Sequence, residues 1–382
     1  MKFQLDIACS QLNKNGEELC GDSIEIIRAA DSSIIVLADG LGSGVKANIL
    51  SRITAKTAAT MLKMGGHIDD VIETMIETLP VCRLRNIAYS TFSILQIFDD
   101  GHAYLVEFDN PPAYWGYDES LLYLKRAERQ VGDKVIKESH FEIGVGHWLV
   151  MMSDGILHAG LGGIWNLGWG EEHVGNYVRT LAGGGYTTNL WAEKITDTCN
   201  KFYCGKLGDD ASVVVVKLRK LRKLTALIGP PRNPEDDVLA VNSLNSAEGV
   251  KVICGGTTSQ LAGRILKREI QVNLDDMVSE VVPPTGQIVG IDLVTEGAIT
   301  LYHTLQHLKE DPKKLENIKD GSGRLAKALL MADEIHFIVG LAINPVVHNP
   351  DFPVPFALKH QTVRDIADTL GRMGKKVTVE HY

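Results

Sequence analysis

Two aspartates that follow apolar strands constrain this chain more than any other feature. The apolar run at residues 34–38 ends at Asp39, the run at 148–152 leads to Asp154, and a glycine follows each aspartate. Taken singly, an aspartate between a strand and a glycine is usually a turn residue. An unpaired carboxylate at the end of a buried strand is nevertheless costly, and here the arrangement occurs twice. The pattern therefore predicts a positive group between the two aspartates, most simply a pair of divalent metal ions.

Two further acidic positions extend this pattern. Asp22 precedes the strand-forming run at residues 24–27, and Asp209 and Asp210 precede the valine run at 213–216. Runs of β-branched residues favour strands. The sequence has no His or Cys cluster with ligand spacing, so the predicted site contains only oxygen ligands, which favour Mg²⁺ or Mn²⁺ over Zn²⁺. For Asp22 considered alone, a turn role stays open.

These positions form four motifs whose order is typical of one family. The motifs are GDS at residues 21–23, ADGLGSG at 38–44, MMSDGI at 151–156 and GDDASVVVV at 208–216. Their order and spacing resemble the SpoIIE-like branch of the PP2C-type (PPM) metal-dependent serine/threonine protein phosphatases, over about residues 1–218. The resemblance implies an α+β fold, a PP2C-like layered β-sandwich flanked by helices, with the metals at one end.

The resemblance also implies a role for each matching residue. Asp39 would bridge the metals, Asp154 and Asp209 would each bind a metal, and Asp22 would hold a metal-bound water. The implied catalytic set is Asp22, Asp39, Asp154 and Asp209, and the implied metal set is Asp22, Asp39, the carbonyl of Gly40, Asp154, Asp209 and, as an auxiliary ligand, Asp210. Many relatives place an arginine ahead of the first acidic site, where this chain has Lys14, a candidate phosphate-binding residue that acts as a point charge.

The implied activity is that of a phosphoserine/phosphothreonine protein phosphatase in bacterial signalling. It would use water activated by two Mn²⁺ or Mg²⁺ ions, and its partner would be a phosphoprotein substrate. Two alternatives remain: a phosphohydrolase acting on a small molecule, and a non-catalytic signalling or binding scaffold. The complete set of aspartates argues against the scaffold.

Length and composition limit the number of domains, the kinds of binding partner and the compartment that we expect for this chain. The 382 residues are enough for two domains, and the net charge of −9 argues against broad binding to nucleic acid or to anionic membranes. No apolar run reaches the ~18–20 residues of a membrane span. The six cysteines form no CxxC pair, and the first residues do not read as a signal peptide. We therefore expect a cytoplasmic protein with reduced thiols.

A basic stretch marks the expected join between two domains. It covers residues 217–223, and the helix- and strand-breaking segment 229–234 follows soon after. We expect a phosphatase domain at 1–218 and a smaller α/β domain at 224–382, with a regulatory or ligand-binding role. In the second domain, the sequence predicts strands at 250–254, 288–293, 334–339 and 376–381 that alternate with helices, and this alternation predicts a mostly parallel sheet.

One loop of the second domain is a candidate ligand site. It lies between a strand predicted at 250–254 and a helix predicted at 260–267, and consists of Gly255, Gly256, Thr257, Thr258 and Ser259. Small and hydroxyl residues at a helix N-terminus can hold a small anionic ligand, because free backbone N–H groups point outward there. Asp292 and Glu296 are expected to complete the pocket. The alternative is that Thr258 or Ser259 is simply the N-cap of the helix.

Overall fold

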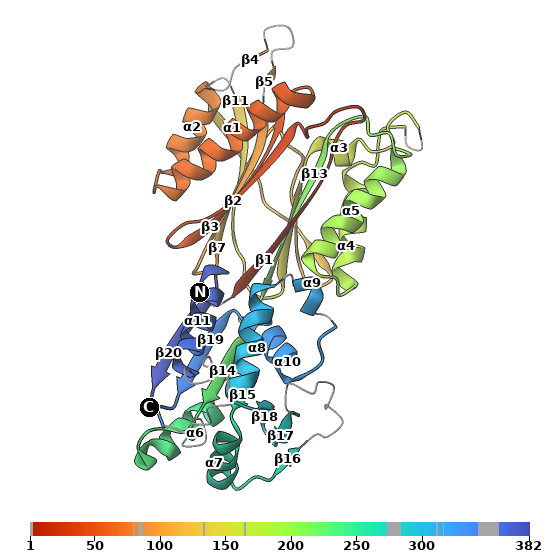
Figure 1. Cartoon of the computed structure of the whole chain (residues 1–382). Helices are drawn as coiled ribbons and strands as arrows, with labels where there is room; N and C mark the ends of the chain where they lie inside the picture. The colour runs from red at the N-terminus through yellow and green to blue at the C-terminus, as the bar shows by residue number, and fades with distance from the viewer. Residues whose placement is uncertain are drawn as a thin grey trace. The chain divides into compact units, whose positions relative to one another are not determined.

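The chain divides into two compact units, residues Met1–Lys220 and Leu221–Tyr382 (Figure 1). The computed structural model describes residues 3–78, 81–82, 87–88, 90–132, 134–163, 166–272, 284–310, 312–315, 317–342 and 359–382. The sequence also predicts a helix over residues 69–79. Its expected last residue, Leu79, and the side chain of Cys82 lie outside the described part of the chain.

The first unit contains two antiparallel sheets. The five-stranded sheet has the order β1 (Gln4–Leu12), β13 (Ala211–Arg219), β12 (His147–Met152), β8 (Tyr114–Tyr117) and β9 (Ser120–Leu122). The six-stranded sheet has the order β10 (Ala127–Val131), β11 (Lys134–Glu142), β7 (His102–Phe108), β6 (Ser90–Phe98), β3 (Ser32–Gly40) and β2 (Asp22–Arg28). A separate short pair is formed by β4 (Val81–Cys82) and β5 (Ile87–Ala88).

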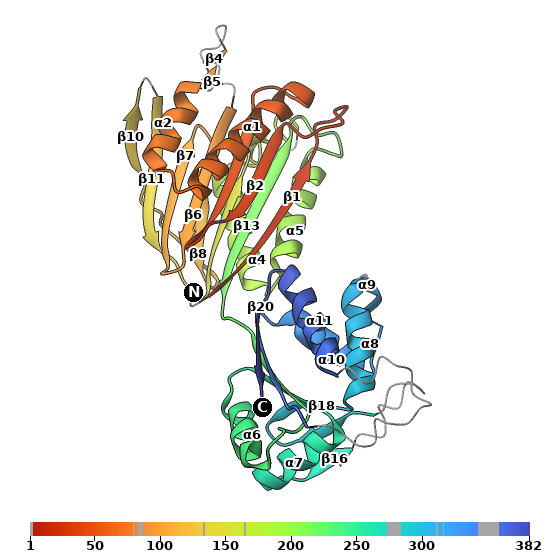
Figure 2. The same cartoon turned by 60° about the vertical axis from the view of Figure 1, so that its left-hand side comes forward.

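The two sheets face each other, and pairs of helices cover their outer sides (Figure 2). Strand β3 shows how the sequence specifies these layers, because successive side chains of a strand point to opposite faces. Ile34 and Val36 pack against the helices, whereas Ile35 and Leu37 point into the core between the sheets. The six-stranded sheet is covered by α1 (Gly44–Lys63) and α2 (Ile68–Thr78), and the five-stranded sheet by α4 (Glu171–Gly183) and α5 (Thr188–Phe202). The predicted layered sandwich is therefore correct.

The second unit is built on one seven-stranded sheet. Its order is β16 (Ile270–Val272), β17 (Gly286–Ile288), β18 (Ile291–Thr295), β15 (Val250–Cys254), β14 (Lys223–Ile228), β19 (Glu334–Val339) and β20 (Lys376–His381). The five strands from β18 to β20 are parallel, and β16 and β17 add an antiparallel edge. The chain starts at the central strand β14, extends through β15 to β18 on one side, and then crosses to β19 and β20 on the other. This is a doubly wound α/β arrangement.

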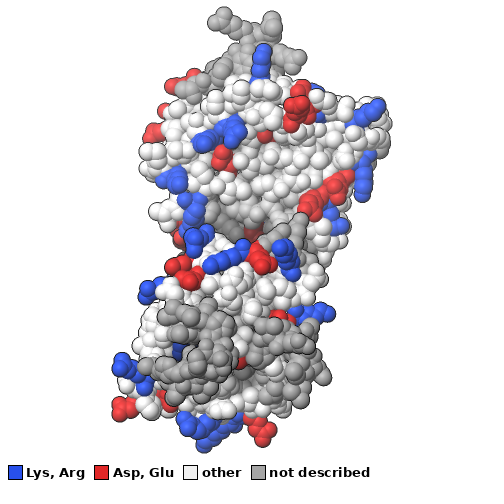
Figure 3. All heavy atoms as spheres, in the orientation of Figure 1, with Lys and Arg blue, Asp and Glu red and all other residues white. Residues whose placement is uncertain are grey.

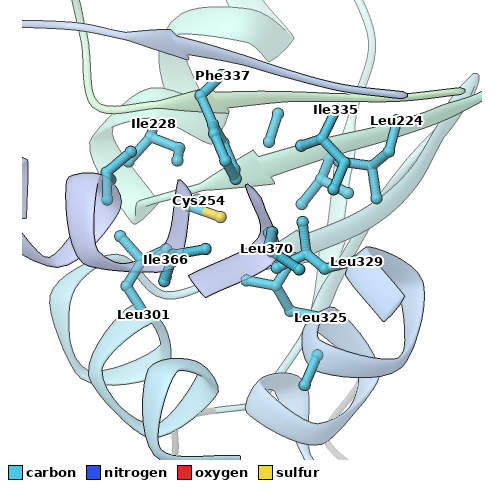
Figure 4. Packing of buried hydrophobic residues seen from close by; sticks show 14 of the residues in the cluster. Leu224, Ile228, Cys254, Leu301, Leu325, Leu329, Ile335, Phe337, Ile366 and Leu370 are labelled. Carbon is cyan, nitrogen blue, oxygen red and sulfur yellow. The ribbon is translucent and has the colours of Figure 1, made fainter. Parts of the chain in front are cut away.

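Helices pack on both faces of this sheet. One face carries α6 (Asp237–Ser246), which follows the short helix η1 (Pro234–Asp236), and α7 (Gly256–Leu266). The other carries α8 (Ala298–Lys309), α9 (Pro312–Leu315), α10 (Gly321–Met331) and α11 (Lys359–Arg372). Figure 4 shows the core on this second face, where Leu301, Leu325 and Ile366 from the helices point toward Ile228 and Phe337 of the sheet.

Several helices and strands differ from expectation, and three of these differences are instructive. The strand β10 (Ala127–Val131) was not predicted, because it carries three consecutive charged or amide side chains, Glu128, Arg129 and Gln130, and lacks the apolar–polar alternation of a half-buried strand. The strand expected at 288–293 is instead a hairpin, because Gly290 adopts φ +81° and turns the chain between β17 and β18. The helix expected from residue 260 already begins at Gly256.

On the face seen in Figure 3, basic and acidic side chains of the described residues are interspersed among uncharged ones. None of the helices in the described part of the chain has the length and apolar composition that a membrane span needs.

Candidate active site

The predicted acidic residues meet at one end of the sandwich in the first unit. Asp22 opens β2 and lies directly opposite Asp39 near the end of β3 in the six-stranded sheet. In the five-stranded sheet, β12 leads to Asp154 at the start of the short helix α3 (Asp154–Leu157), and Asp210 immediately precedes β13. The Asp39 carboxyl is close enough to those of Asp22, Asp154 and Asp209 for each to perturb it. The structure thus brings all five predicted aspartates together.

A serine connects the two sheets at this end. Ser153 donates from its hydroxyl to Asp22 Oδ2 at 2.7 Å, across 131 positions of sequence. The same hydroxyl accepts from the backbone N–H of Ser212 at 2.9 Å, and the Ser153 N–H donates to the Ser212 carbonyl at 3.0 Å. Ser153 is fully buried. Sequence reasoning did not single it out, although the serine of the Ser-Asp-Gly motif was the available signal.

The crowding of carboxyls changes their acidity. Burial, together with the charges of Asp22, Asp154 and Asp209, raises the pKa of Asp39 to about 10. Burial also raises the pKa of Asp22 to about 7, although hydrogen bonds from Ser212 and Ser153 oppose this shift. Without a compensating cation, the site therefore retains protons that ordinary aspartates would release.

Two buried carboxylate oxygens lack partners, and this observation tests whether divalent ions fit the site. Among the described residues, Asp22 Oδ1 and Asp210 Oδ2 are buried without a hydrogen-bond partner, whereas Asp210 Oδ1 accepts from the Lys14 N–H at 2.9 Å. Within the same residues, no three Asp, Glu, His or Cys side chains form a ready-made metal cage. Mg²⁺ and similar ions need no such cage, because they commonly bind one or two carboxylates and keep several waters. The donor set therefore fits hard divalent cations.

The glycine after each key aspartate allows a close backbone approach. A Cβ on Gly40 would lie 2.2 Å from the carbonyl oxygen of Ala47 in α1, and one on Gly155 would lie 2.0 Å from the carbonyl oxygen of Asp210. Any larger residue would push α1 away from β3, or α3 away from the start of β13. The two Asp-Gly pairs are thus required by packing around the acidic cluster as well as by turn formation.

The more exposed edge of the cluster carries two basic side chains. The ammonium of Lys14 lies 4.0 Å from Asp209 Oδ1, and both side chains are roughly one-third exposed, at 35% and 39%. The pKa of Asp209 is raised by burial and by the charge of Asp154, and Lys14 opposes this shift. His158 Nδ1 lies 3.7 Å from Asp154 Oδ2. His158 follows Asp154 by four residues, a spacing that brings the two side chains together on one side of a helical turn.

The loop predicted as a ligand site lies in the second unit and differs from expectation. Gly256, Thr257, Thr258 and Ser259 form the first turn of α7, and the N-cap is Gly255. The N-cap interpretation of Thr258 or Ser259 is therefore wrong. Asp292 does not join this loop, because it lies near the opposite end of β18 and accepts from the Lys251 N–H at 2.8 Å.

Comparison with known proteins agrees with this architecture. The model of the family Stage II sporulation protein E (SpoIIE) matches residues 29–219, half of the chain. Together with the layered sandwich, this match defines the class of the first unit as a PP2C-type serine/threonine phosphatase. The chain belongs to the SpoIIE family.

Solved structures with similarity to this chain include two of the phosphatase domain of SpoIIE from Bacillus subtilis. One, in a crystal form without domain swapping, is 21% identical with a TM-score of 0.44, covering 57% of this chain and 94% of the other. The second, which also holds a fragment of the regulatory domain, is 21% identical with a TM-score of 0.49, covering 57% and 64%. The RsbU and RsbW domains of a Mycobacterium tuberculosis protein are 13% identical with a TM-score of 0.48, covering 84% and 78%. No curated protein matches the sequence.

Proposed function

We propose that the first unit removes phosphate from phosphoserine or phosphothreonine in a protein substrate, with Mn²⁺ or Mg²⁺ as its cofactor. The observation that carries this proposal is the convergence of five aspartates from two sheets, two of which have buried oxygens without partners among the described residues. Family membership supplies the reaction class. We propose the catalytic domain at 1–218, acting in bacterial signalling, and the second domain at 224–382 as its regulator.

Each residue has a proposed task. Asp39, Asp154, Asp209 and the carbonyl of Gly40 would hold the metal ions, with Asp22 and Asp210 supporting them. When bound, two divalent ions lower the pKa of water and neutralise charge on the phosphate.

The remaining tasks belong to the protein's own groups. Asp22 has a pKa of about 7 in the metal-free site; bound cations would lower this pKa, so Asp22 would act there as a carboxylate that accepts hydrogen bonds. Ser153 fixes the orientation of its carboxyl through the hydrogen bond to Oδ2. Lys14, beside Asp209, places a positive charge where a phosphate would approach.

A cytoplasmic setting is part of the proposal. Five cysteines in the described residues are free thiols, namely Cys9, Cys20, Cys199, Cys204 and Cys254. Free thiols are typical of a reducing compartment.

The test is hydrolysis of a phosphoserine peptide and of para-nitrophenyl phosphate, with and without Mn²⁺. Asp39→Asn and Asp154→Asn are assayed in parallel with Asp31→Asn, an exposed aspartate that directly precedes β3 and serves as the matched control. We expect Mn²⁺-dependent release that both site variants abolish and the control retains. Release from a phosphometabolite but not from the peptide would favour the small-molecule alternative. Metal binding without any turnover would favour the scaffold.

A further inference from the structure

At the carboxyl edge of the parallel sheet in the second unit, three neighbouring strands are followed by glycines, so the backbone there carries no side chains. Strands β19, β14 and β15 are each followed directly by a glycine, namely Gly340, Gly229 and Gly255. Their N–H groups donate to the last residue of the next strand: Gly340 to Ile228, Gly229 to Cys254 and Gly255 to Thr295. The three glycines therefore lie side by side in one row. In doubly wound sheets, ligands bind beyond this edge.

Gly255 and Gly297 bring two loops of this edge together. A Cβ on Gly297, which precedes α8, would lie 3.5 Å from the Cα of Gly255. Gly255 has φ +122°, a conformation that residues with a side chain rarely adopt. Because neither glycine has a side chain, another molecule can approach the backbone closely where α7 begins.

The first turn of α7 has N–H groups that no side chain caps. Gly255 is the N-cap and provides no side-chain acceptor. At α8, by contrast, the Glu296 carboxylate accepts from the Ile299 N–H at 3.1 Å. Uncapped N–H groups at a helix N-terminus attract anions.

A buried hydroxyl without a partner gives an independent indication of a ligand. Thr258 is 1% exposed, and its Oγ1 has no hydrogen-bond partner among the described residues. The hydroxyl points back toward the N-cap, since a Cβ on Gly255 would lie only 2.8 Å from it. A buried polar group left unpaired is costly, so this hydroxyl is explained by a molecule that binds at the loop.

A lysine supplies positive charge at the same edge. The Lys359 ammonium donates to the Gly340 carbonyl at 2.7 Å and lies 2.1 Å from the position of a Cβ on Gly229. Burial lowers the pKa of Lys359, which an anion nearby would counteract. The ammonium thus lies over the same row of glycines from which α7 begins.

We propose that the second unit binds a phosphate group, either free phosphate or that of a small phosphoester, at the start of α7. The backbone N–H groups of Gly256 and Thr257 and the Thr258 hydroxyl contact the phosphate, and Lys359 contributes its charge along the same edge. This site is separate from the acidic cluster of the first unit and does not depend on the phosphatase assignment.

The test uses inorganic phosphate as the probe, titrated into the full chain by calorimetry with EDTA present, which removes metal-dependent binding. Two pairs of variants isolate the site. Gly256→Asp places a carboxylate on the first turn, and its matched control is Gly256→Ser. A Cβ at position 256 meets no atom within 4 Å, and an acidic residue at a helix N-terminus favours the helix, so both variants should fold. Thr258→Val removes the hydroxyl while keeping the shape, and Thr258→Ser restores it.

We expect one phosphate per chain, lost in Gly256→Asp and retained in Gly256→Ser. Thr258→Val should weaken binding about tenfold, the effect of one hydrogen bond, whereas Thr258→Ser should remain within about twofold of the wild type. Absence of heat up to about 10 mM phosphate, where a 1 mM site would be filled, would overturn the proposal. Equal binding by Gly256→Asp and wild type would place the phosphate elsewhere and overturn it as well. AMP and glucose 6-phosphate form a second arm: tighter binding than phosphate identifies a phosphoester ligand, and weaker binding identifies free phosphate.

Discussion

Asp39→Asn should stabilise the metal-free protein while removing its response to metal. In the native state, burial and neighbouring carboxyls raise the pKa of Asp39 from 3.8 to about 10. At pH 7 the unfolded chain ionises this group, but the native state does not. Ionisation therefore stabilises the unfolded state relative to the native state by about 1.36 kcal/mol for each of about three pH units. The destabilisation of the native state by Asp39 has an upper bound of about 4 kcal/mol. Asparagine keeps the shape and removes this difference.

Tryptophan fluorescence during urea unfolding measures the unfolding free energy of the first unit, which contains Asp39. All five tryptophans of the sequence lie at or before residue 191, so their emission reports on the first unit alone. In EDTA at pH 7, we expect the unfolding free energy of Asp39→Asn to exceed that of the wild type by up to about 4 kcal/mol. With excess Mn²⁺ the order should reverse, because ligand binding stabilises only a native state that binds it.

The control for this measurement is a second Asp→Asn substitution in the same unit. Asp31→Asn removes an exposed carboxylate at the other end of the same strand, and it should change neither stability nor metal response by more than about 0.5 kcal/mol. If metal-free Asp39→Asn were less stable than the wild type, the reasoning from crowded buried carboxyls would be wrong. A variant that Mn²⁺ stabilises as much as it stabilises the wild type would remove Asp39 from the metal set.

Three further predictions concern the same cluster. Ser153→Ala should lower the unfolding free energy by about 1–3 kcal/mol in urea titrations, because it leaves Asp22 Oδ2 and the Ser212 N–H without their shared partner; an unchanged value would contradict this. The native pKa of Asp22, raised to about 7, means that the metal-free native state binds more protons than the unfolded state. As pH rises from about 4 to 7, Asp22 alone should lower the unfolding free energy by up to about 1.4 kcal/mol per unit, in addition to the contribution of Asp39 over the same range, and a rise would refute the sign. Gly40→Ala should abolish peptide hydrolysis and destabilise the first unit by about 1–3 kcal/mol, because its Cβ would overlap the Ala47 carbonyl; an active, equally stable variant would contradict the packing role.

The sequence predicted most of the fold because its signals are local. A continuous run of valines marked β13, and the expected strands at 250–254, 334–339 and 376–381 coincide with β15, β19 and β20. The prediction from sequence was wrong where contacts between distant residues determine the secondary structure more strongly than the local residue pattern does. The polar strand β10 is held by its pairing with β11. The N-cap and first turn of α7 together contain two glycines, two threonines and a serine, a composition that favours a loop in isolation.

The sequence predicted the acidic residues of the candidate site, but it did not predict the contacts that position them. The aspartates were recognisable because each stands beside a strand. The hydrogen bond between Ser153 and Asp22 joins residues that are far apart in sequence, and no local pattern encodes such a pair. The same holds for Lys14 beside Asp209 and for the unpaired hydroxyl of Thr258, which depends on how α7 packs. The metal and phosphate roles of these residues remain predictions.

The pairing of β1 with β13 has a consequence for synthesis of the protein. Gln4 lies opposite Arg219, so the strand of the first unit that is synthesised first pairs with the strand of that unit that is synthesised last. Until β13 emerges, the nascent chain exposes the edges of β1 and β12 and lacks Asp209 and Asp210, and such long-range pairing also makes folding slow. A premature stop or a proteolytic cut ahead of β13 therefore cannot yield a partly working enzyme. The cell obtains either the whole first unit or a strand-exposing fragment that is a substrate for chaperones and proteases.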